Sequence, residues 1–375
     1  MALIFNKADE SPQTHLLIIG VGAYPYLHTD AAGNPQTDNV FGHLRDLTSP
    51  AESAAMFYRE FIGFKKSLAR PLGSIEVLIS DPRTDGLVYP GLESELPTVE
   101  NIETAYYAWK ARCDTNEDNV AIFFFSGHGF ELTEHLLVAA DFGRHHDRTW
   151  ISGLIDFDST RMAFHGCLAQ TQLFFVDTCR TVDTAMLLRR INARIIDGAN
   201  HLIPECKFNL TVKAAAHNEQ AFGFPDRASF FTKALLNGLR GNGAEFTGGQ
   251  WVVSIHNLSG GINSWVAIEG GGRFDQRCSC STTDTTAIIK RNTPPSAVLL
   301  VDCNPREATG EAEMSCVNVN TKRVYTQIRQ PNPWIIDLTA GIYQIDATFH
   351  NPLFKSSPEF KVVNPPGDKH IITCA

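Results

Sequence analysis

Two short apolar segments that each end in reactive polar residues constrain this chain more than any other feature. Residues 123–129 read FFFSGHG and residues 174–180 read FFVDTCR. Each run is rich in Phe and Val and too short to span a membrane, so it predicts a buried strand of a mostly parallel sheet. In open α/β sheets, ligands and catalytic groups gather beyond the carboxyl ends of the strands. We therefore expect His128 and Cys179 at the same edge of one sheet.

The pairing of these two side chains has a direct chemical meaning. A thiol becomes a strong nucleophile only when a nearby base or cation helps to form the thiolate, and an imidazole supplies that base. A lone cysteine is often a core residue, but Asp177 and Arg180 flank Cys179, and burial of this strand end would also bury two charges. We therefore predict a nucleophile at Cys179 and a general base and acid at His128.

The order and spacing of the two motifs resemble those of the caspase-like peptidases, and among them the metacaspases and bacterial orthocaspases. Ser-Gly-His-Gly follows one apolar strand, Asp-x-Cys follows another, and the spacing agrees with the roughly 50 residues expected for caspases. The resemblance covers most of residues 14–265. It implies an α/β fold, an αβα sandwich around a mostly parallel sheet. It also implies an oxyanion hole formed by the backbone N–H groups of Gly129 and Cys179.

The same resemblance indicates a class of substrate. Metacaspases and orthocaspases place an aspartate two residues before the nucleophile, where it pairs with a substrate arginine or lysine, and this chain has Asp177 there. A carboxylate can accept both arms of an arginine side chain. Ser126 resembles a second residue of that pocket. A third acidic member usually comes from the loop after the first strand, where Asp30, Asp38 and Asp46 remain alternatives.

Composition bears on partners and location. The net charge of −9 argues against a nucleic-acid partner, because phosphate binding needs a basic surface. No window approaches 18 uncharged apolar residues, and the N-terminal residues lack the pattern of a signal peptide. The nine cysteines are an odd number and scattered, which suits a reducing cytoplasm better than a disulfide framework. We therefore expect a cytoplasmic protein without a membrane span.

Two clusters resemble metal sites only superficially. Residues 145–147 read HHD and residues 278–280 read CSC. Neither has a further ligand at the spacing that a structural metal site requires. We therefore expect no metal and no cofactor.

A change in composition divides the chain into three parts. Residues 1–268 alternate between strand and helix patterns, which predicts one α/β domain. Residues 269–296 carry three consecutive glycines, a polar run and two prolines, the composition of a connector. Residues 297–375 contain short strand candidates separated by turn signals, which predicts an antiparallel β-sandwich. We expect this accessory domain to contribute packing or to bind a regulatory protein, without chemistry of its own.

These observations predict a cysteine endopeptidase that acts on a protein or peptide substrate and cleaves after arginine or lysine. Regulated proteolysis, in cell death or in defence against phage, is the expected setting by analogy with the family. The first alternative is a catalytically silent caspase-like scaffold that binds a protein partner, although a binding module does not need both His128 and Cys179. An acyltransferase that uses the same two residues is the other alternative, and Asp177 disfavours it.

The stretch after the nucleophile allows two interpretations. It contains Arg189, Arg190 and Arg194, and a protease with basic specificity would find its own cleavage site there, as in a zymogen. The competing interpretation is an amphipathic helix over residues 185–196 with solvated arginines.

Overall fold

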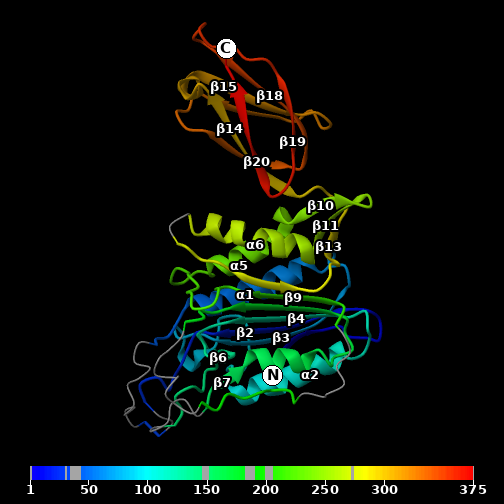
Figure 1. The fold of residues 1–375 in the computed structure, drawn as a ribbon, viewed down its shortest axis with the longest axis vertical. Helices are drawn as coiled ribbons and strands as arrows, with labels where there is room; N and C mark the ends of the chain where they lie inside the picture. Colours follow the sequence, from blue (N-terminus) through cyan, green and yellow to red (C-terminus); the bar gives the residue numbers. More distant parts are fainter. Residues whose placement is uncertain are drawn as a thin grey trace. The chain divides into compact units, whose positions relative to one another are not determined.

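The structure is a computed structural model, shown in Figure 1. It describes residues 2–29, 32–33, 44–145, 152–181, 191–198, 206–271 and 274–374. The chain forms two compact units, one made of Met1–Leu236 with Ser259–Ile288 and the other of Asn237–Leu258 with Ile289–Ala375.

The first unit is built around a seven-stranded sheet with the strand order β1-β3-β2-β4-β8-β9-β12. The five inner strands run parallel, whereas the edge strands β1 and β12 are antiparallel to their neighbours. The strands are β1 (Leu3–Asn6), β2 (Thr14–Val21), β3 (Leu72–Ser80), β4 (Val120–Ser126), β8 (Thr171–Asp177), β9 (Phe208–Lys213) and β12 (Ser279–Thr282).

Helices cover both faces of this sheet. Phe124 of β4 stacks on Phe57 of α1 (Ser49–Phe64), whereas the next ring toward the N-terminus, Phe123, lies near Trp109 of α2 (Val99–Cys113). Successive strand side chains point to opposite faces, so α1 and α2 lie on opposite sides, as Figure 1 shows. This double cover explains why every residue of β2, β3, β4 and β8 is buried.

The remaining elements of the first unit complete the layers. The strands β5 (Gly129–Glu131), β6 (His135–Val138) and β7 (Leu154–Asp156) form a small antiparallel sheet that shares the core of α2. The helix α3 (Phe157–Phe164) is on the same side, because Phe164 stacks on Trp109. The helix α5 (Phe230–Asn237) lies on the α1 side (Figure 1). The predicted αβα sandwich with a mostly parallel sheet is therefore confirmed.

The second unit contains a three-stranded sheet, β10-β11-β13, and two further sheets that share one core, with the orders β17-β14-β20 and β16-β15-β18-β19. Burial alternates along β14 and β15, so every second side chain enters the core. The predicted C-terminal β-sandwich is confirmed, except that β14 and β20 pair in parallel. The strands are β10 (Ala244–Thr247), β11 (Gln250–Ser254), β13 (Ala287–Arg291), β14 (Ser296–Asn304), β15 (Ala312–Asn318), β16 (Val324–Ile328), β17 (Trp334–Thr339), β18 (Gly341–Phe349), β19 (Glu359–Val363) and β20 (Gly367–Thr373).

Residues 269–296, assigned to a connector by their composition, contain two strands. The strand β12 pairs with β9 at the edge of the central sheet, and β13 belongs to the sheet with β10 and β11. Other helical segments are η2 (Asp85–Leu87), η4 (Gly238–Asn242), α6 (Ile255–Glu269) and η5 (Arg306–Glu311). In the described part of the chain, no helix combines the length and the apolar character needed to cross a membrane.

Candidate active site

His128 and Cys179 follow the ends of two neighbouring parallel strands. The last residue of β4, Ser126, pairs with the last residue of β8, Asp177, and each candidate catalytic residue comes two positions later. The N–H of Gly127 donates to the carbonyl oxygen of Asp177 over 3.2 Å, which continues the pairing beyond the strands. Adjacent strands lie about 4.8 Å apart. The sheet itself therefore brings the two segments to one edge.

Beyond the sheet, the histidine and cysteine segments stay side by side. The N–H of Glu131 donates to the carbonyl oxygen of Thr181 over 3.1 Å. An added Cβ at Gly129 would lie 2.7 Å from Oγ1 of Thr178 and 2.9 Å from the carbonyl oxygen of Cys179. A side chain at Gly129 would thus push the two segments apart. This close approach explains why a glycine follows the histidine.

Two groups outside the sequence motifs hold His128. The hydroxyl of Tyr24 accepts a hydrogen bond from the backbone N–H of His128 over 2.8 Å, and the two ring centroids lie 4.9 Å apart. Nε2 of His128 lies 2.7 Å from the carbonyl oxygen of Arg45. A carbonyl can only accept, so Nε2 carries a proton and Nδ1 is the basic atom of the neutral ring.

Neither group was predicted from the sequence. Tyr24 lies three residues after β2, and Gly20 near the end of β2 pairs with Ser126 at the end of β4. Its position just beyond the end of a neighbouring strand was the signal that could have placed Tyr24 near His128. A backbone carbonyl such as that of Arg45 leaves no signal in the sequence. Among the three candidate aspartates, Asp46 accepts the N–H of Tyr24 over 2.7 Å. The other two, at positions 30 and 38, lie outside the described residues.

The thiol of Cys179 contacts the segment that follows β9. Its Sγ lies 3.7 Å from the carbonyl oxygen of Ala221. Burial raises the pKa of Cys179, and the negative charge of Asp177 adds to the rise. A thiol with a raised pKa is protonated at neutral pH, so a base must remove its proton before it attacks.

The two charged neighbours of the cysteine are both buried, contrary to the expectation from sequence. Asp177 is 5% exposed and Arg180 is 8% exposed. Hydroxyl groups of Ser126, Ser229 and Thr232 donate to Oδ2 of Asp177 over 3.3, 2.5 and 2.8 Å. Burial raises the pKa of Asp177, and these hydrogen bonds oppose the rise. The prediction of exposure was wrong because it considered only the charges near Cys179 in the sequence. The hydroxyl groups that allow Asp177 to be buried come from segments distant in the sequence.

Arg180 ties the cysteine segment to its surroundings. Its guanidinium forms an ion pair with Glu131 of β5, and Glu131 also lies 2.9 Å from Nδ1 of His217. The backbone N–H of Arg180 donates to the carbonyl oxygen of Glu219 over 3.0 Å. The residue after Cys179 is therefore held by both the histidine segment and the segment after β9.

Residues 221–229 form a wall that contacts both Asp177, at the end of β8, and Cys179, two positions later. One end of the wall touches Cys179 through the carbonyl oxygen of Ala221. The other end carries Ser229, which binds Asp177. The position of this wall therefore determines the space next to the nucleophile.

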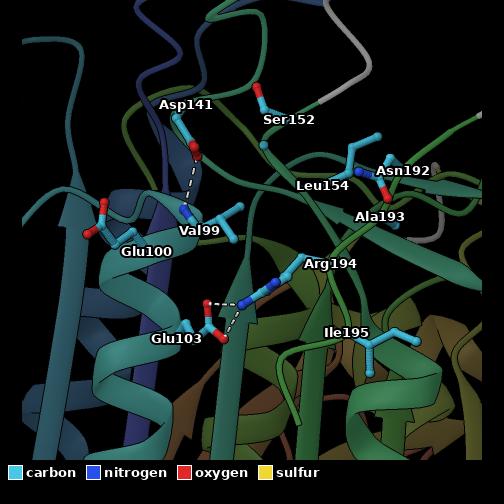
Figure 2. Close-up of a pocket in the computed structure, with 11 residues that line it drawn as sticks. Val99, Glu100, Glu103, Asp141, Ser152, Leu154, Asn192, Ala193, Arg194 and Ile195 are labelled. Carbon is cyan, nitrogen blue, oxygen red and sulfur yellow. Dashed lines mark hydrogen bonds and ion pairs between the residues drawn. The ribbon is translucent and has the colours of Figure 1, made fainter. Parts of the chain in front are cut away.

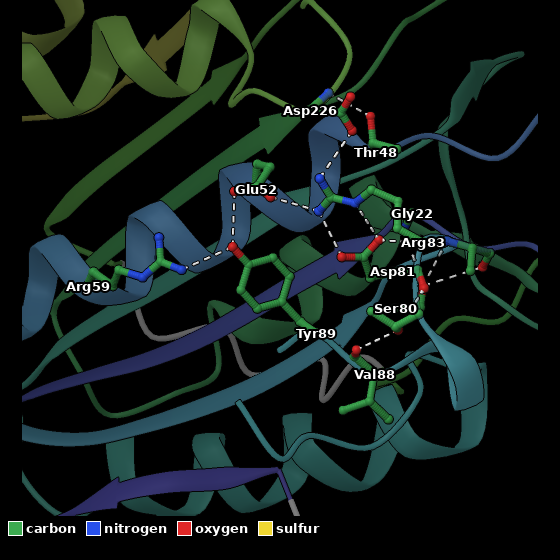
Figure 3. A network of polar contacts seen from close by, with 12 residues as sticks. Gly22, Thr48, Glu52, Arg59, Ser80, Asp81, Arg83, Val88, Tyr89 and Asp226 are labelled. Carbon is green, nitrogen blue, oxygen red and sulfur yellow. Dashed lines mark hydrogen bonds and ion pairs between the residues drawn. The ribbon is translucent and has the colours of Figure 1, made fainter. Parts of the chain in front are cut away.

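Arg83 holds the middle of this wall (Figure 3). Its Nη1 donates to Asp226 over 3.1 Å, while Nη2 donates to Asp81 and to Glu52, each over 2.7 Å. The N–H of Asp226 donates to Oγ1 of Thr48 over 2.8 Å. The strand end of β3 and the start of α1 are thus connected to the wall, a link that the sequence did not reveal.

A cavity of about 510 Å³ lies elsewhere, beside the start of α2 (Figure 2), and none of its described lining residues belongs to the candidate site. Arg194 lines it and pairs with both carboxylate oxygens of Glu103 over 2.7 and 3.0 Å. The backbone N–H and carbonyl of Arg194 bond to Leu154 and Asp156 of β7. Residues 191–196 are not helical, so the end of the predicted amphipathic helix is wrong; its earlier part, with Arg189 and Arg190, lies outside the described residues.

Within the described ranges, no three His, Cys, Asp or Glu side chains are grouped as metal ligands would be. Of the sequence cluster at residues 145–147, only His145 is described.

Comparison with known proteins places this arrangement in context. A family model described as the caspase domain matches residues 15–281. The uncharacterized protein y4kE of Sinorhizobium fredii is 27% identical over 201 residues, which cover 52% of this chain and 58% of that protein, less than two thirds of its length. The crystal structure of protein GSU0716 from Geobacter sulfurreducens aligns with 73% of this chain and 95% of its own, at 14% identity and a TM-score of 0.42.

Proposed function

Because the chain belongs to the caspase-domain family of cysteine peptidases, we propose that it is an active endopeptidase with Cys179 as nucleophile and His128 as general base and acid. The placement of both residues two positions beyond the paired ends of β4 and β8 carries this proposal. The hydrogen bond from Nε2 of His128 to a backbone carbonyl supports it, since it assigns the ring proton to Nε2 and makes Nδ1 the basic atom.

The proposed reaction begins with a neutral thiol. Nδ1 of His128 removes the proton of Cys179, and Sγ attacks the scissile carbonyl carbon. The resulting oxyanion accepts hydrogen bonds from the N–H groups of Gly129 and Cys179. The imidazolium then gives its proton to the leaving amine, and a thioester forms. A water molecule, deprotonated by His128, attacks the thioester and releases the thiol and the carboxylic acid.

We further propose cleavage after arginine or lysine. Among the described residues, only hydroxyl groups contact the buried carboxylate of Asp177, and no Lys or Arg does. A buried carboxylate without a cation is costly, and burial raises its pKa accordingly. A substrate guanidinium or ammonium group would supply the missing charge. Ser126 then acts by orienting the carboxylate.

One observation supports an additional protein-binding function for the C-terminal sheets. Exposed apolar side chains lie on the outer face of the sheet β16-β15-β18-β19, on strands whose inner residues fill the core. They are Val324, Ile328, Ile342, Phe360 and Val362. We propose that this face binds a regulatory protein, a role compatible with peptidase activity. Regulated proteolysis in a reducing cytoplasm, in cell death or defence against phage, is proposed from the family relation and from the nine free cysteines.

Peptide-library profiling of the purified full chain tests the proposal, with Cys179→Ala as the matched control. We expect cleavage after arginine and lysine that the control lacks. Equal cleavage by both proteins, or none by either after incubation long enough for self-processing, would favour the scaffold alternative.

A further inference from the structure

A second cavity, of about 150 Å³, lies next to the residue that follows the nucleophile. Most of the residues that line it come from α3 and from the last two strands of the central sheet, β9 and β12. The pairs Ser279↔Lys213 and Ser281↔Thr211 place four of its side chains on one face of the sheet. The described lining residues are Asp158, Arg161, Arg180, Thr211, Lys213, Ser279 and Ser281.

Positive charge exceeds negative charge on these walls. Asp158, the one carboxylate among the described lining residues, is occupied by Nζ of Lys213 at 2.8 and 3.1 Å and by the backbone N–H of His135 at 3.0 Å. The charge of Arg180 is balanced by Glu131, which is not among the lining residues. Two cations are thus paired, and a third remains.

That third cation is Arg161. Within the described part of the chain it has no carboxylate partner, and its Nη1 lies 3.3 Å from Nε2 of His165. Burial lowers the pKa of Arg161, and the negative charge of Asp158 only partly offsets this effect. In addition, the buried Nε of Arg180 has no hydrogen-bond partner among the described residues. A partly buried cation and a buried donor of this kind normally have a counter-charge or an acceptor.

We propose that this cavity binds a small tetrahedral oxyanion, such as a phosphate group, with Arg161 and Lys213 as charged donors and Ser279 and Ser281 as hydroxyl donors. A cavity of this size holds several water molecules and accommodates one phosphate group. Guanidinium groups bind phosphate through two hydrogen bonds, and lysine binds it as a point charge. The chain as a whole carries a net charge of −9, so the local positive excess does not follow from its composition.

The site lies close to the nucleophile but is not used by the proposed peptidase reaction. Arg180 links the cavity to Cys179 along the backbone. A second link runs through His135, whose backbone N–H donates to Asp158 in the cavity. Nε2 of His135 lies 2.8 Å from Oγ1 of Thr178, the residue before the nucleophile. An oxyanion here is therefore placed to act as an effector rather than as a substrate.

Thermal unfolding of the 375-residue Cys179→Ala chain tests the proposal without interference from self-cleavage. The midpoint is measured against orthophosphate, with sodium chloride added to hold ionic strength constant. A ligand that binds only the folded state raises stability with the logarithm of its concentration, so we expect a rise that sodium chloride alone does not produce. A phosphate ester, glycerol 3-phosphate, is titrated in parallel. Tighter binding of the ester identifies a phosphorylated metabolite, and equal binding identifies the free ion.

Two variants with opposite expected effects sharpen the test. Arg161→Gln should weaken phosphate binding at least tenfold. Asp158→Asn should strengthen it several-fold, because the amide oxygen still accepts the N–H of His135 while the competing negative charge is lost. Arg70→Gln, an exposed arginine paired with Asp118, is the control for general surface charge and should leave the response unchanged.

The proposal is overturned if phosphate produces no rise above that of sodium chloride, or if all variants respond alike. If Arg161→Gln does not fold, Asp158→Asn still decides, since an unchanged phosphate affinity in that variant contradicts the proposed charge balance.

Discussion

Replacement of Asp177 by asparagine should separate substrate specificity from stability. The substitution keeps the shape of the side chain and removes its charge, so the hydroxyl groups of Ser126, Ser229 and Thr232 retain an oxygen to bind. A substrate arginine would lose the partner of a buried ion pair, a cost of about 2–5 kcal/mol. We therefore expect kcat/KM for arginine substrates to fall roughly 30-fold to several thousand-fold, at about 1.4 kcal/mol for each factor of ten.

The stability of the folded protein should not fall when Asp177 is replaced by asparagine, although activity does. Burial raises the pKa of Asp177 in the folded protein. A carboxyl group with a raised folded pKa binds its proton more tightly in the folded state, so its stabilising contribution is present at acid pH and is lost as the pH rises through that pKa. The ionised, buried carboxylate therefore destabilises the folded state at pH 7. Asp177→Asn should leave the thermal midpoint at pH 7 unchanged or raise it.

The assay compares two peptides that differ only in arginine or citrulline before the scissile bond. Citrulline has the shape of arginine without its charge. A double-mutant cycle over enzyme and substrate then isolates the charge interaction. Asp118→Asn is the control for the loss of one carboxylate, because Asp118 is exposed, pairs with Arg70 and precedes the start of β4, at the opposite edge of the sheet from the site. If Asp177→Asn lowers the rates on both peptides by the same factor, Asp177 does not bind the substrate cation.

Three further predictions concern the catalytic geometry. Gly129→Ala should reduce kcat by at least tenfold and destabilise the protein by about 1–3 kcal/mol, measured by peptide hydrolysis and denaturant unfolding, because the added methyl group would meet the cysteine segment at 2.7 Å. Alkylation of Cys179 by iodoacetamide should accelerate only at a pH above that at which an ordinary free thiol ionises, since its pKa is raised; fast alkylation at neutral or acid pH would instead reveal a preformed ion pair with His128. Arg83→Gln should lower kcat/KM by releasing Asp226 and the wall that it holds, while Arg83→Lys restores part of the loss; unchanged kinetics of Arg83→Gln would show that the wall needs no such support.

Much of the architecture was predictable because it depends on local patterns. Alternating strand and helix periods predicted the αβα sandwich, and the two apolar runs predicted neighbouring parallel strands. Since parallel strands end at the same edge of a sheet, the spacing of His128 and Cys179 was enough to expect them there. Composition likewise predicted β-structure after residue 297, although it did not reveal that residues 279–282 would return to the central sheet.

The tertiary structure alone decided which groups surround these residues. Tyr24 and the carbonyl of Arg45 contact His128 from positions 104 and 83 residues away. The charges of Asp177 and Arg180 predicted that the strand end before Cys179 would be exposed. Hydroxyl groups 51 to 55 residues away along the chain nevertheless allow Asp177 to be buried. Sequence periodicity determines which face of a strand or helix is buried, because that depends on the nearest neighbours along the chain. Whether a charge is buried, and which nitrogen of a histidine holds the proton, depends on partners that only folding brings into contact.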